Sequence, residues 1–208
     1  MTQPKLPAVK QPDWPRDRID HFILARMETQ GVGPVAPADD RTLLRRLHLD
    51  LTGLPPTPEQ TTAFLGATAK DRPQAIAQTV DALLALPQFG PRWARHWLDV
   101  ARYAESSGLS RNMLYPVAWR YRNYVIRAFN TDKPYDQFVR EQIAGDLLPA
   151  KSHAQREEQT LGTAFLTIGP KTLNEGVIEQ FNYNVADDQI DATTRAFLGL
   201  TAACARWA

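Results

Sequence analysis

Cysteine is the residue that this sequence has least of, because Cys204 is the single one among 208 residues. One cysteine cannot form an internal disulfide, and it cannot supply a cysteine-rich zinc site. A disulfide-stapled fold and a zinc module of that kind are therefore excluded. The chain is long enough to be held together by a well-buried hydrophobic core instead.

The sequence also lacks an imbalance of charge and long apolar runs. Its 24 basic and 23 acidic residues leave a net charge of +1, so a general electrostatic attraction to nucleic acid is not expected. No apolar stretch approaches the roughly 20 residues that a membrane-spanning helix needs. The N-terminal stretch has no apolar segment typical of a signal peptide. We therefore predict no nucleic-acid partner and no membrane span.

Strand signals are sparse, whereas helix signals recur along the chain. Prolines at positions 4, 7, 12 and 15 predict a proline-rich, extended linker over residues 1–16. Beyond it, apolar residues at helical spacing follow good N-cap residues, which are Asp17, Thr57 and Asp71. We predict a mainly α fold, an irregular multi-helix single domain with long loops over residues 17–208.

The C-terminal part is expected to end in one further helix. The sequence predicts irregular structure over residues 167–184 and a last helix over residues 185–204. Three carboxylates would lie near the start of that helix, where negative charge complements the helix dipole. They are Asp187, Asp188 and Asp191.

Residues 92–105 contain the candidates for catalytic chemistry. His96 and Asp99 are three apart and so are neighbours on a helix, and Glu105 follows its end. A histidine–carboxylate pair can serve as an acid/base couple or as part of a metal site, and Arg102 could position an anionic group. The alternative, which we favour, is a polar network beside a tryptophan-rich core. The sequence leaves the question of enzymatic activity open but favours a non-catalytic role.

The longer stretch of residues 92–127 is locally basic and rich in aromatic residues, with seven arginines against two carboxylates. Its tryptophans are Trp93, Trp97 and Trp119. Aromatic faces beside arginines can bind sugars, nucleobases or anionic ligands. We favour core packing of the first two tryptophans, with arginines paired to acids such as Glu141 and Asp146. Exposed rings would instead support carbohydrate binding.

Five long strings are similar to those of a known family. They are IDHFILARM, LLRRLHLDLTGLPPTPE, FGPRWARHWLDVARYA, AWRYRNYVIRAFNTDKPYDQFVREQIAGDLLP and DATTRAFLGLT. Over about residues 16–206 the chain resembles the planctomycete cytochrome c-associated domain of unknown function. That domain is found in large exported proteins, often with c-type cytochrome domains and a second uncharacterised domain. The resemblance implies these domains as partners, a periplasmic or cell-surface location, and no established enzymatic activity.

The resemblance also gives a meaning to Cys204. In the family, the segment after LGLT usually continues as C-A-R-C-H or a close variant, which is a C-x-x-C-H haem attachment motif. Here Cys204 matches the first cysteine, but Trp207 and Ala208 stand where the second cysteine and the histidine belong. We therefore expect no cofactor in this chain, haem c in intact relatives, and a domain truncated at Ala208.

Two functions follow as hypotheses. The first is a structural or interaction module, or one associated with electron transfer, in an exported protein that carries c-type cytochrome domains. The alternative is an enzyme or binding domain that acts on polysaccharide. The enzyme would use His96, Asp99 and Glu105, with Arg102 or Arg120 positioning an anionic group. A carbohydrate-binding domain would use exposed tryptophans.

Overall fold

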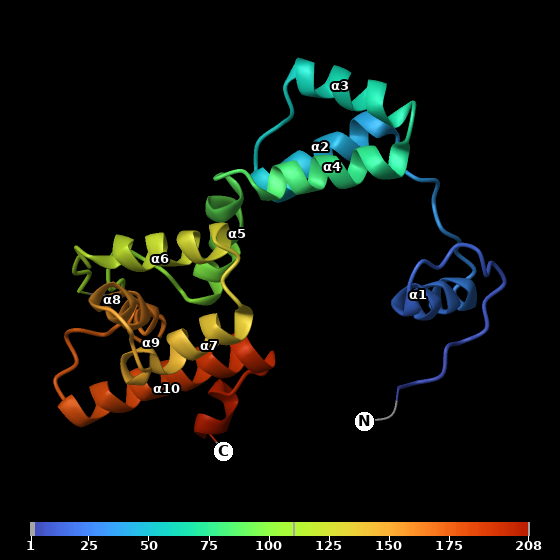
Figure 1. Ribbon diagram of the computed structural model, residues 1–208. Helices are drawn as coiled ribbons and strands as arrows, with labels where there is room; N and C mark the ends of the chain where they lie inside the picture. Colours follow the sequence, from blue (N-terminus) through green and yellow to red (C-terminus); the bar gives the residue numbers. More distant parts are fainter. Residues whose placement is uncertain (1–2, 110, 208) are drawn as a thin grey trace. The chain divides into compact units, whose positions relative to one another are not determined.

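The computed structural model describes residues 3–109 and 111–207, apart from the side chains of Arg206 and Trp207, and the described chain is mainly α-helical (Figure 1). The predicted mainly α fold is confirmed. An isolated antiparallel bridge joins Ser106 to Leu114 in a loop. The chain forms two compact units, residues 1–42 and 43–208, and each is described by itself.

The first unit contains α1 (Arg18–Thr29) and the proline-rich segment before it. Asp17 caps the helix as predicted, and Asp20 completes a capping box with it. The segment before the helix is bonded to it, because the backbone N–H of Lys10 donates to the carboxylate of Glu28 at 2.8 Å. The proline-rich segment therefore has a defined contact with α1.

The second unit begins with three helices. They are α2 (Asp40–Thr52), whose first residues belong to the first unit, α3 (Pro58–Thr68) and α4 (Arg72–Leu84). Thr57 and Gln60 form the predicted capping box of α3, and Asp71 caps α4. Buried side chains from each helix form a small core, which consists of Leu44, Phe64 and Ala75.

The remaining helices surround a larger core. They are α5 (Phe89–Val100), α6 (Ala118–Asn130), α7 (Tyr135–Ala144), the 3-10 turn η1 (Gly145–Leu147), α8 (His153–Gly162), α9 (Ala164–Thr167), α10 (Ile178–Leu198) and the 3-10 turn η2 (Ala203–Trp207). The helix α6 lies along α5 and contributes Tyr121, Tyr124 and Val125 to the core. Phe138 of α7 and Phe165 of α9 complete it. The core therefore joins segments far apart in sequence.

The last helix differs from the prediction. It begins seven residues before the expected position 185 and ends at Leu198, because Gly199 adopts a left-handed φ of +64° that terminates it. The start was missed because Val177, which occupies the N-cap position, offers no capping side chain. The aspartates from Asp187 to Asp191 therefore lie in the middle of α10. The helix dipole acts only within the first turn, so the dipole explanation of these carboxylates is wrong.

A chain of hydrogen bonds runs through the larger core. The indole N–H of Trp97 donates to the hydroxyl of Tyr121 at 2.9 Å, and this hydroxyl donates to Gln142 at 2.6 Å. The amide of Gln142 donates to the hydroxyl of Tyr124 at 3.3 Å, and Tyr124 donates to Glu141 at 2.7 Å. Each of these side chains thus has a partner for the polar group that it brings into the core, as buried polar groups require.

Glu141 ends this chain as a carboxylate that is only 1% exposed. The ammonium of Lys133 donates to it and also to Glu158, at 3.2 Å. Burial would raise the pKa of Glu141, but hydrogen bonds from Lys133, Gln137 and Tyr124 outweigh burial, and the net shift of the pKa is downward. The Lys133–Glu141 pair is therefore a buried ion pair that depends on both partners.

The substitution Lys133→Met is expected to lower the free energy of unfolding by about 3–5 kcal/mol, because Glu141 would keep a buried charge without its counter-ion. The double variant Lys133→Met/Glu141→Gln should recover much of this loss, since it removes both charges. Urea unfolding followed by circular dichroism measures both. Arg140→Met is the control, because Arg140 pairs with Asp136 on the surface, and its cost should stay below about 1 kcal/mol. The prediction would be contradicted if Lys133→Met and Arg140→Met lowered the free energy of unfolding equally.

Candidate functional site

Three of the four predicted site residues lie exposed on α5 or in the loop after it: His96, Asp99 and Glu105. The ring of His96 meets Trp93 edge-on, with 5.6 Å between the centroids. Glu105 accepts a hydrogen bond from Arg122 at 2.8 Å. His96 and Glu105 therefore contact different residues, Trp93 and Arg122. The catalytic role suggested for these residues stays a prediction.

Arg102, the fourth candidate, lies in a more constrained setting. Its backbone has a left-handed φ of +58°, which is uncommon for a residue with a side chain. Its Nη2 donates to Asp188 Oδ2 at 3.1 Å, while Nε and Nη1 are buried without a partner in the described structure. Gly169 lies against this pair, since a Cβ there would be 2.5 Å from Asp188 Oδ2 and 2.7 Å from Arg102 Nη2. Only a glycine lets the loop approach so closely.

Lys171 brings a second cation to this partly buried cluster. Its ammonium donates to backbone carbonyls of the same loop and lies 5.8 Å from the ring centroid of Tyr115. Burial lowers the pKa of Lys171 and raises the pKa of Asp188, although the charges of Arg102 and Lys171 act in the opposite direction on Asp188. Arg102, Lys171 and Asp188, which we call the Arg102 cluster, therefore hold the loop after α9 between α5 and α10. No local motif connects these distant residues, so the cluster could not be predicted from the sequence.

The tryptophans divide into core and surface residues. Trp97 packs edge-on against Phe138, with 4.8 Å between the centroids, and also contacts Phe165. Trp93 and Trp119 are 37% and 48% exposed. The predicted core position is confirmed for Trp97 and wrong for Trp93, whose position on α5 turns it toward the surface.

The arginines of this region form ion pairs, as predicted. Arg120 pairs with Glu157, and Arg127 lies 3.7 Å from Glu158. Both acids belong to α8. Neither is Glu141 or Asp146, which we named as partners from the sequence. The carboxylate of Glu141 pairs instead with Lys133. Much of the local positive charge is therefore offset by a neighbouring helix.

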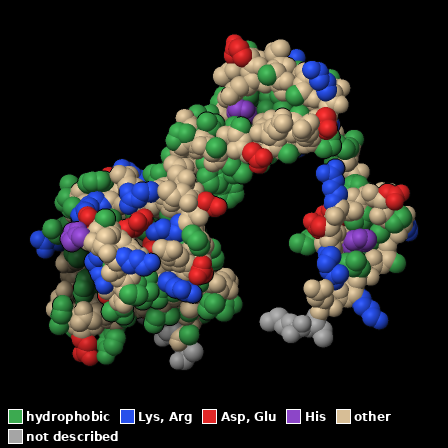
Figure 2. All heavy atoms as spheres, in the orientation of Figure 1, with side chains coloured by type: hydrophobic (Ala, Val, Ile, Leu, Met, Phe, Trp, Pro, Cys, Tyr) green, Lys and Arg blue, Asp and Glu red, His purple; other side chains and the backbone are tan. Residues whose placement is uncertain are grey.

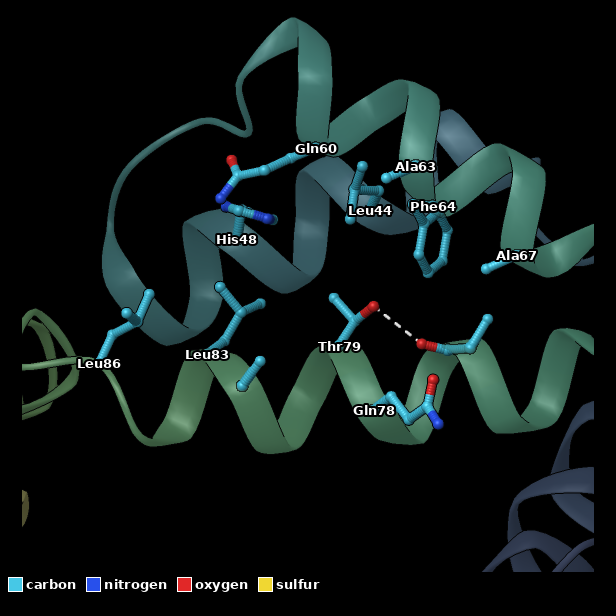
Figure 3. Close-up of a pocket in the computed structure, with 12 residues that line it drawn as sticks. Leu44, His48, Gln60, Ala63, Phe64, Ala67, Gln78, Thr79, Leu83 and Leu86 are labelled. Atoms are coloured by element: carbon cyan, nitrogen blue, oxygen red, sulfur yellow. Dashed lines mark hydrogen bonds between the residues drawn. The ribbon is translucent and has the colours of Figure 1, made fainter.

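A groove of about 370 Å³ opens between α2, α3 and α4 (Figure 3). Apolar side chains line most of it, and His48 and Gln60 lie together at one end (Figure 3). His48 is only 5% exposed, and burial lowers its pKa. The groove thus has a neutral imidazole in its wall at neutral pH.

The C-terminal segment holds Cys204 in an exposed position within η2. The side chain of Trp207 and residue Ala208 lie outside the described residues, so the comparison with a haem motif rests on the sequence alone. Among the residues that the structure describes, no group of three or more His, Cys, Asp and Glu side chains could hold a metal ion. Across the same residues, no helix combines the length and apolarity needed to cross a membrane.

The fold and these contacts define an all-helical domain whose polar clusters are mainly ion pairs and core hydrogen bonds. Residues 18–207 match the PSCyt2 family, described as protein of unknown function (DUF1549). The chain belongs to this family. No curated protein and no solved structure matches the chain. The match establishes the family without assigning an activity.

The Arg102 cluster generates a test of stability. Asp188→Asn is expected to lower the free energy of unfolding by about 1–3 kcal/mol, because two partly buried cations, Arg102 and Lys171, would lose their shared counter-charge. Thermal unfolding by calorimetry measures the effect. Glu105→Gln makes the same change of charge in an exposed ion pair and should cost less than about 1 kcal/mol. If Asp188→Asn lowers the free energy of unfolding no more than Glu105→Gln does, the cluster does not stabilise the fold as we infer.

The buried His48 generates a test of pH dependence. Its pKa is lowered in the folded protein, so its contribution to stability is present above the ordinary value of 6.5 and is lost as pH falls below it. Wild-type stability should therefore decline on acidification, and His48→Gln should reduce that decline. Urea unfolding at a series of pH values measures it, with His153→Gln as a control at an exposed histidine. Parallel pH profiles for wild type and His48→Gln would refute the expectation.

Proposed function

We propose that this domain is a non-catalytic interaction module of an exported protein associated with c-type cytochromes. The observation that supports it is a set of exposed apolar side chains along α10. Figure 2 shows apolar side chains, in green, among charged ones on the visible face of the larger unit. Of the α10 residues, all of which are described, only Ala192 is buried. Six large apolar side chains in and beside α10 are 58–73% exposed, and they are Val177, Ile178, Tyr183, Ile190, Leu198 and Leu200. Tyr183, Ile190 and Leu198 recur at spacings of seven and eight residues and so share one face of α10, and exposed apolar side chains gathered on one face are typical of a contact site. We call these six residues the α10 surface.

The sequence suggests the partner that would cover the α10 surface. In the family that the chain resembles, a haem-bearing segment begins directly after this helix. Here the following turn is anchored to α10, because the backbone N–H of Ala203 donates to Asp191 at 3.2 Å. The exposed Cys204 follows. A c-type cytochrome domain is therefore the partner whose position the resemblance predicts, and electron transfer is the process that such an assembly would serve.

The residues of this chain do not themselves fit a haem c site. Attachment requires two thiols and an axial histidine in one C-x-x-C-H segment. The corresponding segment offers the thiol of Cys204 alone, since Trp207 and Ala208 occupy the other positions. We therefore assign haem to the partner and no haem chemistry to this chain.

The polysaccharide alternative has no comparable support. Trp93 and Trp119 are partly exposed, but single apolar side chains on a surface are common and do not by themselves indicate a sugar site. Glu105 is held by Arg122 in an ion pair. The interaction role is therefore the function that the geometry supports best.

The proposal is tested by titrating the purified domain with purified c-type cytochrome domains encoded in the same genome. Isothermal titration calorimetry and co-elution followed by haem absorbance should detect a complex. Ile190→Asp should weaken it at least about tenfold, because it places a charge within the apolar contact. Leu147→Asp is the control, since Leu147 is also apolar and, at 80%, more exposed than Ile190, but lies in η1. Absence of any complex, or equal effects of the two variants, would overturn the proposal.

A further inference from the structure

Aromatic side chains from three helices line a cavity of about 340 Å³ in the larger unit. They come from α5, α6 and α7, and they are Phe89, Trp97, Phe129, Tyr135 and Phe138. The α6–α7 turn adds Asp132 to the lining. The cavity combines apolar walls with a carboxylate, a combination common in sites for small ligands.

The rings form a continuous wall. Phe89 meets Phe129 edge-on, with 6.4 Å between the centroids, and Phe129 is also 6.4 Å from Phe138. Phe138 in turn packs against Trp97. Because Phe138 is buried and Trp97 is hydrogen-bonded, this part of the wall is fixed, whereas Tyr135 is 65% exposed. The faces of such rings carry negative potential, which attracts cations.

The position of Asp132 is set by its backbone. Its φ of +49° is left-handed, and its N–H donates to the carbonyl of Phe129 at 3.2 Å, while the N–H of Lys133 donates to that of Ala128 at 3.0 Å. This geometry ends α6 in the way that glycine or asparagine usually does. An aspartate in its place adds an exposed negative charge beside the aromatic wall.

The other charged groups near the cavity balance one another. Lys133 also lines the cavity, but its ammonium pairs with Glu141 and Glu158. Arg127 lies near Glu158 as well. Because the ammonium of Lys133 is already paired with two carboxylates, Asp132 is the charged lining residue that remains to meet a ligand.

We propose that this cavity binds a small organic cation through a methylated ammonium group. The methyl groups would pack on the ring faces, and Asp132 would supply the counter-charge. A neutral apolar ligand could pack against the same aromatic side chains. It would, however, displace water from the Asp132 carboxylate without offering a positive charge in return. An anion would be repelled by Asp132. The combination of aromatic wall and unbalanced carboxylate therefore favours the cation over both.

The test uses choline and its neutral isostere, in which a tert-butyl group replaces the trimethylammonium group. Each is titrated into the full 208-residue chain. Binding is followed by isothermal titration calorimetry and by intrinsic tryptophan fluorescence, to which Trp97 in the cavity lining contributes. Choline should bind in the millimolar range or tighter, and at least about threefold more tightly than the isostere. Equal affinities, or no binding of choline at millimolar concentrations, would overturn the proposal.

Two variants separate the role of the carboxylate from a general effect of charge. Asp132→Asn should weaken choline binding at least about threefold and leave binding of the isostere unchanged. Asparagine tolerates the left-handed backbone, so the turn is kept. Asp136→Asn makes the same change of charge at an exposed residue outside the lining and should leave the affinity for choline at its wild-type value. If both variants weaken choline binding equally, the cavity is not the site.

Discussion

The larger unit depends on the hydrogen-bond chain that begins at Trp97 and ends at the buried pair of Glu141 and Lys133. Burying a carboxylate is costly unless a counter-ion accompanies it, so α7 must place Glu141 where the turn after α6 places Lys133. This requirement fixes how α6 and α7 meet. It also brings Phe138 against Trp97, and so forms one wall of the aromatic cavity.

A second electrostatic contact serves a different part of the unit. Arg102, Asp188 and Lys171 join the end of α5 to the middle of α10 and to the loop before that helix. The side of α10 that carries Asp188 is thereby fixed against the core, and the α10 surface faces solvent. The proposed protein contact lies on α10, whereas the proposed cation site is lined by α5, α6 and α7. Each proposal therefore depends on a different one of these two clusters.

Local signals predicted local structure well. Asp17, Thr57 and Asp71 were identified as helix caps because capping involves residues within one turn of each other. The last helix was misplaced because Val177 at its N-cap offers no such signal. Arg102 was named as able to position an anionic group, but the structure pairs it with Asp188, which is 86 residues away. The candidate site could therefore be predicted only in part.

The sequence by itself determined the helical class, the starts of α1, α3 and α4, and the family, because periodicity, capping and long matching strings are all properties of neighbouring residues. It also contains a single cysteine, Cys204. Only the tertiary structure decided that Trp97 is internal while Trp93 is exposed, and that Asp132 stands beside an aromatic wall. The physical reason is that burial and charge pairing depend on which helices meet, and those contacts join residues that are far apart along the chain.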